Sequence, residues 1–184
     1  MSFFIVRLDS VKSTPWRNGG GTTRELMAWP IAGPWRWRMS VAEVTQSGPF
    51  STFEGVQRWF AVLAGAGVRL HLDGQVHVLT QLSDPFVFDG GVPPRCELIA
   101  GSTQDFNLMV QGTTAVMERV AGRAEKTVAA GTTVAVYAYG TGAGLRCEGE
   151  AVSLPPHSLA VQTLKAQARV ELSSPHALWM EIAP

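Results

Sequence analysis

Cysteine is scarce in this chain of 184 residues, which contains two. Cys96 and Cys147 cannot form a disulfide framework, and alone they cannot supply the four ligands of a structural zinc site. We therefore expect a cytoplasmic protein, in which both thiols are buried as small apolar side chains.

Charge of a single sign is lacking as well. Fifteen Lys and Arg balance fifteen Asp and Glu, so the formal net charge is 0. Nucleic-acid-binding proteins gather phosphates with a basic field, so no nucleic-acid partner is expected. Twelve of the fifteen cations are Arg, whose planar fork suits bidentate recognition of carboxylates and phosphates. The composition therefore favours small anions as partners.

Long apolar runs are also missing. No stretch approaches the roughly 18 apolar residues that indicate a membrane span, and the first residues do not form a leader peptide. We expect neither secretion nor membrane insertion. Hydrophobic residues nevertheless make up 46% of the chain. At about 150 residues per domain, its length predicts one domain or two small units sharing a core.

Glycine and proline are abundant, with 19 and 11 residues, and they separate short apolar segments in the rhythm of an all-β chain. Residues 35–44 alternate strictly, with Trp37 and Met39 on one face and Arg38 and Ser40 on the other. Further strands are expected at residues 60–72, 75–79, 86–88, 96–100, 106–111, 133–139, 144–147, 151–154, 159–163 and 168–172.

Residues 22–29 allow two interpretations. Thr22 followed by Glu25 could be a capping box that opens a short helix ended by Pro30. The same residues could equally form a strand. A natural seam follows at residues 111–114, so we predict an N-terminal unit, 1–112, that carries the ligand pocket and a smaller C-terminal unit, 113–184.

The first candidate binding segment surrounds three successive glycines, Gly19 to Gly21. Glycine lets the backbone approach a ligand, and neighbouring Arg17 and Asn18 supply hydrogen-bond donors that suit an oxyanion. The segment lacks the Gly-Lys-Ser/Thr ending of a nucleotide-binding phosphate loop. A flexible surface turn is the alternative.

The second candidate segment mixes apolar and polar side chains: Phe50, Ser51, Phe53, Arg58 and Trp59. Aromatic walls with a few polar anchors are typical of a small-molecule pocket, in which an Arg can clamp a carboxylate. Alternatively, the aromatic side chains close the end of a barrel and Arg58 is solvated.

The four histidines form no metal-binding motif. A two-residue hairpin at Asp73-Gly74 would place His71 opposite Val76 and His77 opposite Leu70, on opposite faces of the sheet. A three-residue loop would instead bring the two histidines opposite each other. A catalytic metal needs about three converging protein ligands, so we expect no metal and no cofactor.

Four motifs together resemble the HutD/Ves family of bacterial proteins, over about residues 3 to 112. In the family's order they are Trp16-Arg17-Asn18-Gly19-Gly20-Gly21, Trp37-Arg38-Met39-Ser40-Val41-Ala42, Gly48-Pro49-Phe50-Ser51 with Gly55 and Arg58, and Asp105-Phe106-Asn107-Leu108-Met109. The resemblance implies a cupin fold (a double-stranded β-helix or jelly roll), arranged as a bicupin with two β-barrel units. It also implies a regulatory link to histidine utilisation and a small carboxylate ligand such as urocanate or formylglutamate. Dimers are common among cupins.

The sequence departs from the metal-binding motifs of cupins. Gly65 and His71 fit the first motif, but Asp73 stands at its second His position and His77 at its nearest Glu position. The second motif has Pro94 where a His is needed. Metal-dependent oxygenase or isomerase chemistry is therefore disfavoured.

These observations predict a metal-free cupin that binds a small anionic metabolite and regulates histidine catabolism without converting it. The alternative is a metal-independent cupin enzyme acting on a small carboxylate, and a third class is a structural or partner-binding β-domain whose cationic face stays empty. We assign no catalytic residue and allow a homodimer. The predicted binding residues are Arg17, Asn18, Arg38, Ser40, Phe50, Ser51, Phe53, Arg58 and Trp59, with Asp105 and Asn107 orienting the cations from behind.

Overall fold

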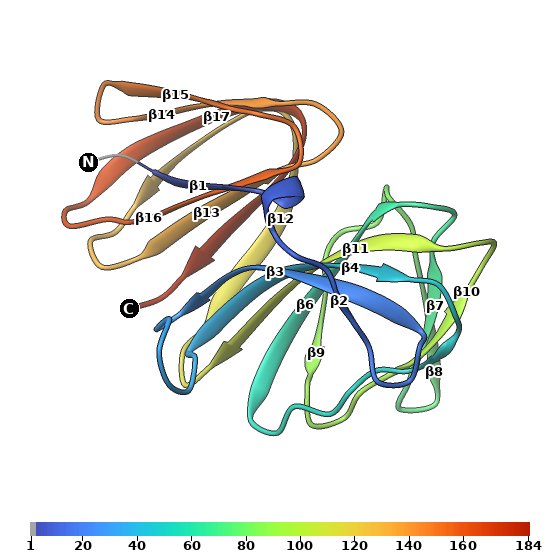
Figure 1. Cartoon of the computed structure of the whole chain (residues 1–184). Coiled ribbons are helices and arrows are strands. Elements are labelled where there is room, and N and C mark those ends of the chain that lie inside the picture. Colours follow the sequence, from blue (N-terminus) through green and yellow to red (C-terminus); the bar gives the residue numbers. More distant parts are fainter. Residues whose placement is uncertain (1–2) are drawn as a thin grey trace. The chain divides into compact units, whose positions relative to one another are not determined.

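The computed structural model describes residues 3–184, which form β-strands and one 3-10 turn, Leu8–Ser10 (Figure 1). The predicted all-β class is confirmed. The chain divides into two compact units at the predicted seam, after Gly112. Strand β1 (Phe4–Arg7), however, pairs with β16 (Ser158–Thr163) of the C-terminal unit. Residues 3–10 therefore belong with 113–184, which corrects their predicted assignment to the first unit.

The unit Val11–Gly112, hereafter the front unit, contains two antiparallel sheets. The larger has the order β2 (Thr14–Pro15), β3 (Gly21–Trp29), β4 (Trp37–Val44), β11 (Thr103–Gln111), β6 (Val56–Ala64) and β9 (Phe86–Asp89). The smaller has the order β5 (Gly48–Pro49), β10 (Arg95–Leu98), β7 (Val68–Leu72) and β8 (Gln75–Leu79).

Two sequence-based predictions for the front unit are resolved by these strands. Residues 22–29 belong to strand β3 and not to a helix. The segment 60–72 is two strands, because Gly65 and Gly67 take φ angles of +94° and +105° between them. Both glycines also lie against backbone: a Cβ on Gly67 would lie 2.3 Å from the carbonyl oxygen of Leu79. The break therefore requires glycine.

The hairpin at Asp73-Gly74 has the two-residue form. His71 pairs with Val76 and His77 pairs with Leu70, so the two histidines point to opposite faces. The register calculated for a two-residue turn is confirmed.

The other unit, residues 3–10 with 113–184, hereafter the back unit, is built around one antiparallel sheet. Its order is β1, β16, β13 (Thr133–Ala138), β17 (Ala168–Ile182), β14 (Ala143–Cys147) and β15 (Glu150–Leu154), and β12 (Ala115–Val128) also pairs with β17. Strand β12 was not predicted, because its exposed Ala, Gly and charged residues hide the alternation.

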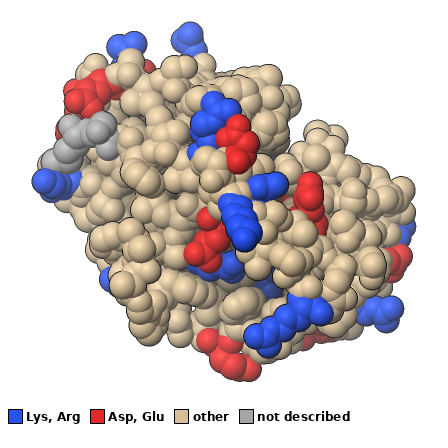
Figure 2. Space-filling model, viewed as in Figure 1, with Lys and Arg blue, Asp and Glu red and all other residues tan. Residues whose placement is uncertain are grey.

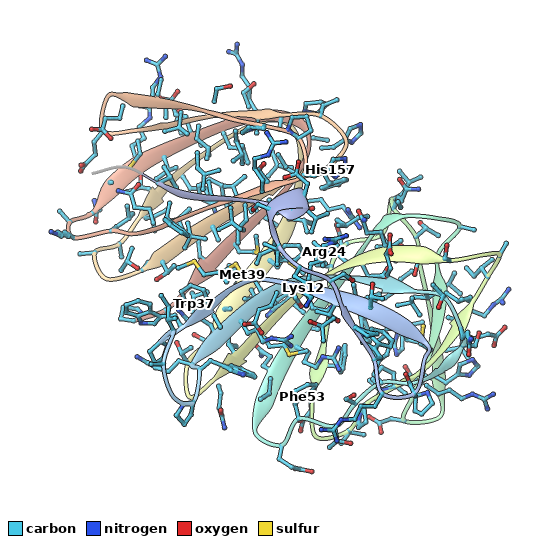
Figure 3. All side chains as sticks on the ribbon, viewed as in Figure 1. Lys12, Arg24, Trp37, Met39, Phe53 and His157 are labelled. Carbon is cyan, nitrogen blue, oxygen red and sulfur yellow. The ribbon has the colours of Figure 1, made fainter. Side chains whose placement is uncertain are left out.

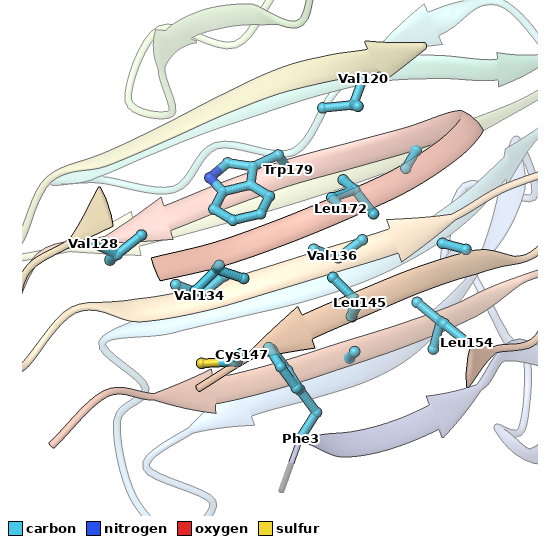
Figure 4. Packing of buried hydrophobic residues seen from close by; sticks show 14 of the residues in the cluster. Phe3, Val120, Val128, Val134, Val136, Leu145, Cys147, Leu154, Leu172 and Trp179 are labelled. Carbon is cyan, nitrogen blue, oxygen red and sulfur yellow. The ribbon is translucent and has the colours of Figure 1, made fainter. Parts of the chain in front are cut away.

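The interior of the back unit is filled by apolar side chains (Figure 4). Trp179, Val136 and Leu172 are at most 1% exposed, and they pack in one cluster with Leu145 and Leu154. The buried polar residues of this unit are uncharged Thr, Ser and Gln. Among the described residues, the buried charged side chains are Arg58 and Asp105, both in the front unit. Residues 3–184 contain no helix with the length and apolar character needed to cross a membrane.

Candidate functional site

Strands β3, β4, β11, β6 and β9 align their inward side chains in three rows across one face of the larger sheet. We name each row by one member: the Asp105 row, the Asn107 row and the Arg58 row. They are Thr23–Ala42–Asp105–Val62, Glu25–Ser40–Asn107–Phe60–Phe86 and Arg38–Met109–Arg58–Phe88. Antiparallel pairing thus brings residues from distant parts of the chain onto one surface.

A cavity of about 740 Å³ lies over these rows, a volume suited to a small molecule. Ser40 and Ala42 line it at the centre of the sheet, where their small side chains leave the space open. The predicted alternation therefore holds over Trp37–Val44, and the strand begins two residues later than predicted. Eight predicted binding residues line the cavity: Arg17, Asn18, Arg38, Ser40, Phe50, Ser51, Phe53 and Arg58.

Trp59 is the predicted binding residue that does not line the cavity. It lies on β6 between Arg58 and Phe60, both of which do. Consecutive side chains of a strand point to opposite faces, so Trp59 is directed away. Its indole instead donates to the side-chain oxygen of Gln57 at 3.2 Å.

Arg58 lies at the inner wall of the cavity and is only 5% exposed. Its Nη2 donates to Oδ1 of Asn107 at 3.0 Å, and its Nη1 donates to the carbonyl oxygen of Ser51 at 3.3 Å. The guanidinium carbon lies 5.2 Å from the ring centroid of Phe50, 5.6 Å from that of Phe53 and 5.0 Å from that of Phe88. Three aromatic rings and two hydrogen bonds therefore hold one cation in place.

No carboxylate of residues 3–184 forms an ion pair with Arg58. Its buried Nε also has no hydrogen-bond partner. Burial, followed by repulsion from the charge of Arg38, lowers the pKa of Arg58 from 12.5 to about 10. A buried cation without a counter-charge is unfavourable, so an anion that enters the cavity would relieve it.

Arg38 is the second guanidinium on this wall, and unlike Arg58 it is paired. Its Nε donates to Oε2 of Glu25 at 2.5 Å, and its Nη1 lies 3.8 Å from Sδ of Met109. The Arg38 side chain is 19% exposed and that of Glu25 is 51% exposed. Glu25 is also the one carboxylate among the residues that line the cavity.

Asp105 and Asn107 were predicted to orient the cations from behind, and the structure separates them. Asn107 accepts the hydrogen bond from Arg58. Asp105 lies one row away, is fully buried and accepts from Oγ1 of Thr103 at 2.7 Å, while its Oδ1 has no partner. Burial raises the pKa of Asp105 from 3.8 to about 7. No cation contacts it within the described residues, which corrects its predicted role.

The three glycines shape a turn and do not line the cavity. Gly19 has a φ of +70°, and a Cβ on Gly21 would lie 2.2 Å from the carbonyl oxygen of Glu43. The side chain of Asn18 accepts from the backbone N–H of Gly20 at 3.0 Å. The glycines therefore build the hairpin that carries Arg17 and Asn18 to the rim of the cavity.

Sequence reasoning missed several lining residues, among them Lys12, Trp16 and Thr23. Trp16 donates through Nε1 to Oγ1 of Thr23 at 2.7 Å, which ties β3 to the segment before it. Lys12 and Phe53 are labelled in Figure 3. Lys12 belongs to no motif, and only the path of the chain before β2 brings it to the cavity.

Metal-ligand geometry is not found in the described part of the chain. Residues 3–184 contain no group of three or more His, Cys, Asp or Glu side chains that could hold a metal ion. His71 lies 3.0 Å from Glu97 through Nε2, and the ring of His77 packs 4.4 Å from that of Phe86. On the face shown in Figure 2, basic and acidic side chains are interspersed.

Comparison with known proteins gives related sequences and structures. A sequence model described as HutD matches residues 8–180. An uncharacterised 21.2 kDa protein from the hutC 3′ region of Pseudomonas putida is 40% identical over 107 residues, 57% of this chain and 56% of that protein. Protein Ves of Cronobacter sakazakii is 37% identical over 112 residues, 60% of this chain and 61% of that protein. The matches thus span just over half of these relatives.

Solved structures resemble the whole chain. HutD from Pseudomonas fluorescens SBW25, in a formate condition, has 29% identity and a TM-score of 0.85, with 99% of this chain and 98% of that chain covered. A Bacillus subtilis oxalate decarboxylase variant has 10% identity and a TM-score of 0.61, with 100% and 77% covered. The second likeness concerns the fold alone, which is that of the cupins.

Proposed function

The chain belongs to the HutD family, and from its cavity we propose that it is a metal-free cupin that binds a small carboxylate at Arg58. We further propose that the front and back units are the two halves of a bicupin, of which the front one carries the ligand. In this proposal the back unit is the half that binds no ligand, because apolar side chains occupy its interior.

The state of Arg58 is the observation that carries this proposal. Its guanidinium is buried at a cavity wall, is oriented by Asn107 and three aromatic rings, and has no counter-charge. A structural arginine is usually paired when it is buried. A ligand carboxylate would supply the missing charge and accept hydrogen bonds from the Nη groups. Nearby Arg38 adds positive potential to the same wall.

The family supports a biological role for this binding. A relative comes from the hutC 3′ region of P. putida, and a structural neighbour is named HutD. We propose that this chain regulates bacterial histidine utilisation in the cytoplasm by binding a carboxylate of the urocanate or formylglutamate class. It would bind this metabolite without converting it.

Calorimetric titration with urocanate and formylglutamate tests the proposal. We expect at least one to bind, and we expect Arg58→Lys to weaken binding by about 1.5–3 kcal/mol because Lys lacks the planar fork. Arg95→Lys is the matched control, since Arg95 is exposed and does not line the cavity. A thermal-shift panel of carboxylates extends the test, because a ligand at 100 times its Kd adds about 2.7 kcal/mol.

Two results would contradict the proposal. One is a folded parent protein that binds neither compound nor any carboxylate of the panel. The other is an Arg58→Lys variant with the affinity of the parent. Recovery of the bound compound after long incubation separates a binding protein from a metal-independent enzyme, because the enzyme would return a product.

A further inference from the structure

We infer that Glu25 determines which carboxylates this cavity accepts: the ligand carries an N–H or O–H donor at the end opposite to its carboxylate, and Glu25 accepts that donor. The inference rests on the proposed function, because it concerns the same cavity. It narrows the ligand class from any small carboxylate to one that bears a hydrogen-bond donor. Of the two proposed ligands, urocanate has one carboxylate and a ring N–H and fits this class, whereas formylglutamate carries a second carboxylate and is disfavoured.

The positions of Glu25 and Arg58 in the sheet place them at two ends of the cavity wall. Glu25 is on β3 and Arg58 is on β6, with β4 and β11 between them. Three strand spacings of about 4.8 Å separate their backbones by roughly 14 Å. Both side chains line the cavity. A small molecule can therefore extend from one to the other.

The bonding of Glu25 leaves acceptor capacity toward the cavity. Its Oε2 accepts from Nε of Arg38 at 2.5 Å, whereas its Oε1 has no hydrogen-bond partner among residues 3–184. An ionised carboxylate accepts through both oxygens and cannot donate. Oε1 of Glu25 is therefore available to accept a hydrogen bond from a ligand donor. The bond from Arg38 fixes the orientation of the carboxylate, so Glu25 is held ready to accept.

The neighbour of Glu25 in the Asn107 row adds a second polar group. Ser40 pairs directly with Glu25, lines the cavity and is 2% exposed. Its hydroxyl makes no hydrogen bond to any other described residue. The hydroxyl faces the cavity and is open to a ligand. A donor-bearing group that reaches Glu25 would pass Ser40 and could bond to it as well.

A second carboxylate is the wrong group for this end, because an ionised carboxylate has no donor to offer to Glu25. A dicarboxylate anchored at Arg58 would bring two negative groups together with no proton between them. Lys12 and Arg17 also line the cavity, and solvent screens their charges and that of Glu25, because all three side chains are exposed. Glu25 thus acts as a specificity-determining residue at one end of an otherwise cationic cavity.

The test is calorimetric titration with four probes: phenylpropanoate, hydroxyphenylpropanoate, pyrrolylpropanoate and glutarate. Hydroxyphenylpropanoate adds an O–H donor to the ring of phenylpropanoate. Pyrrolylpropanoate, attached through a ring carbon, replaces that ring by one with an N–H donor. Glutarate has no ring and ends in a second carboxylate. In the parent we expect at least one donor-bearing probe to bind about tenfold tighter than phenylpropanoate and glutarate, as one charge-assisted hydrogen bond would produce.

Glu25→Gln is the decisive variant. It should reduce the advantage of the donor-bearing probe, because a neutral amide oxygen is a weaker acceptor than a carboxylate oxygen. It should also strengthen glutarate binding, because the negative charge is gone and an amide donor is present. Glu25→Asp keeps the charge but shortens the reach, and it should give an intermediate loss. Glu43→Gln is the matched control, since Glu43 is exposed on β4 and does not line the cavity.

The outcomes separate this inference from the proposed function. The inference is overturned if neither donor-bearing probe is preferred by the parent, or if the preference is undiminished in a folded Glu25→Gln variant. Binding of all four probes that depends on Arg58 would in that case leave the proposed function standing. If none of the probes and neither urocanate nor formylglutamate binds the parent, both fail together.

Discussion

The front and back units build similar antiparallel sheets and treat their interiors differently. In the back unit Trp179, Leu145 and Leu172 meet in one apolar cluster, and no buried residue is charged. In the front unit Ser40 and Ala42 leave a cavity, and Arg58 and Asp105 are buried. Burial of a charge without a partner opposes folding. The contrast shows that the back unit is packed with apolar side chains, whereas the front unit keeps a cavity and two buried charged side chains that oppose its stability.

The largest effect on stability is expected from truncating Trp179, the bulkiest fully buried side chain of the back unit. Trp179 is fully buried, and Trp179→Ala should lower the free energy of unfolding by about 3–5 kcal/mol, because it leaves a cavity. Urea unfolding measures this loss. Val116→Ala, at a 48% exposed position, should change it little. Carboxylate affinity should stay the same in the folded fraction; a large loss would contradict the assignment of the site to the front unit.

The buried acid of the front unit predicts a pH dependence. Burial raises the pKa of Asp105 to about 7 in the folded protein, against its ordinary value of 3.8. Between these values the unfolded chain ionises while the native carboxyl stays protonated, so stability falls as pH rises from about 4 to about 7 and then levels off. The difference of about three pKa units corresponds to on the order of 4 kcal/mol.

Asp105→Asn should remove this part of the slope, since the amide does not ionise. Unfolding in urea at several pH values measures it, with exposed Glu148→Gln in the back unit as control. The variant should gain stability over the parent mainly above pH 7. A variant with the full slope of the parent would show that Asp105 is not its source.

Arg58 should behave in opposite ways in stability and in binding. Arg58→Met keeps the length of the side chain and removes the unpaired buried charge, so we expect unfolding to become harder by about 1–3 kcal/mol while carboxylate binding is lost. Thermal unfolding and calorimetry on the same sample measure the two effects. A variant that is clearly less stable would instead identify Arg58 as a structural residue.

The smallest effect on stability is expected from a substitution that partly fills the cavity. Ser40→Val replaces a hydroxyl that faces the cavity by two methyl groups, so stability should change by less than about 1 kcal/mol in either direction. Ligand affinity should fall because the added bulk enters the centre of the cavity wall. Matched titrations of parent and variant check this, and unchanged affinity would place the ligand away from Ser40.

Local patterns predicted most of the cavity wall. The alternation of residues 35–44 separated Arg38 and Ser40 from Trp37 and Met39, and Ser40 and Arg38 do line the cavity. The same principle, applied to Arg58 and its neighbour Trp59, would have excluded Trp59. Aromatic character was given more weight there than strand alternation. The role of Lys12 could not be predicted, because no local pattern reports where a loop passes over a sheet.

The sequence by itself determined the all-β class, the seam after Gly112 and the face of β4 that carries Arg38, and it limited the hairpin at Asp73-Gly74 to two registers. These features depend on neighbours in the chain, where a period of two and the turn residues are sufficient. Only the tertiary structure decided that Glu25 pairs with Arg38, that Arg58 has no counter-charge and that Arg58 bonds to Asn107 while no described cation contacts Asp105. These features depend on which distant strands pair and on the register shifts at Glu25/Met27 and Gln104/Asp105. A shift of one residue turns a side chain to the other face of the sheet, and short-range periodicity cannot report it.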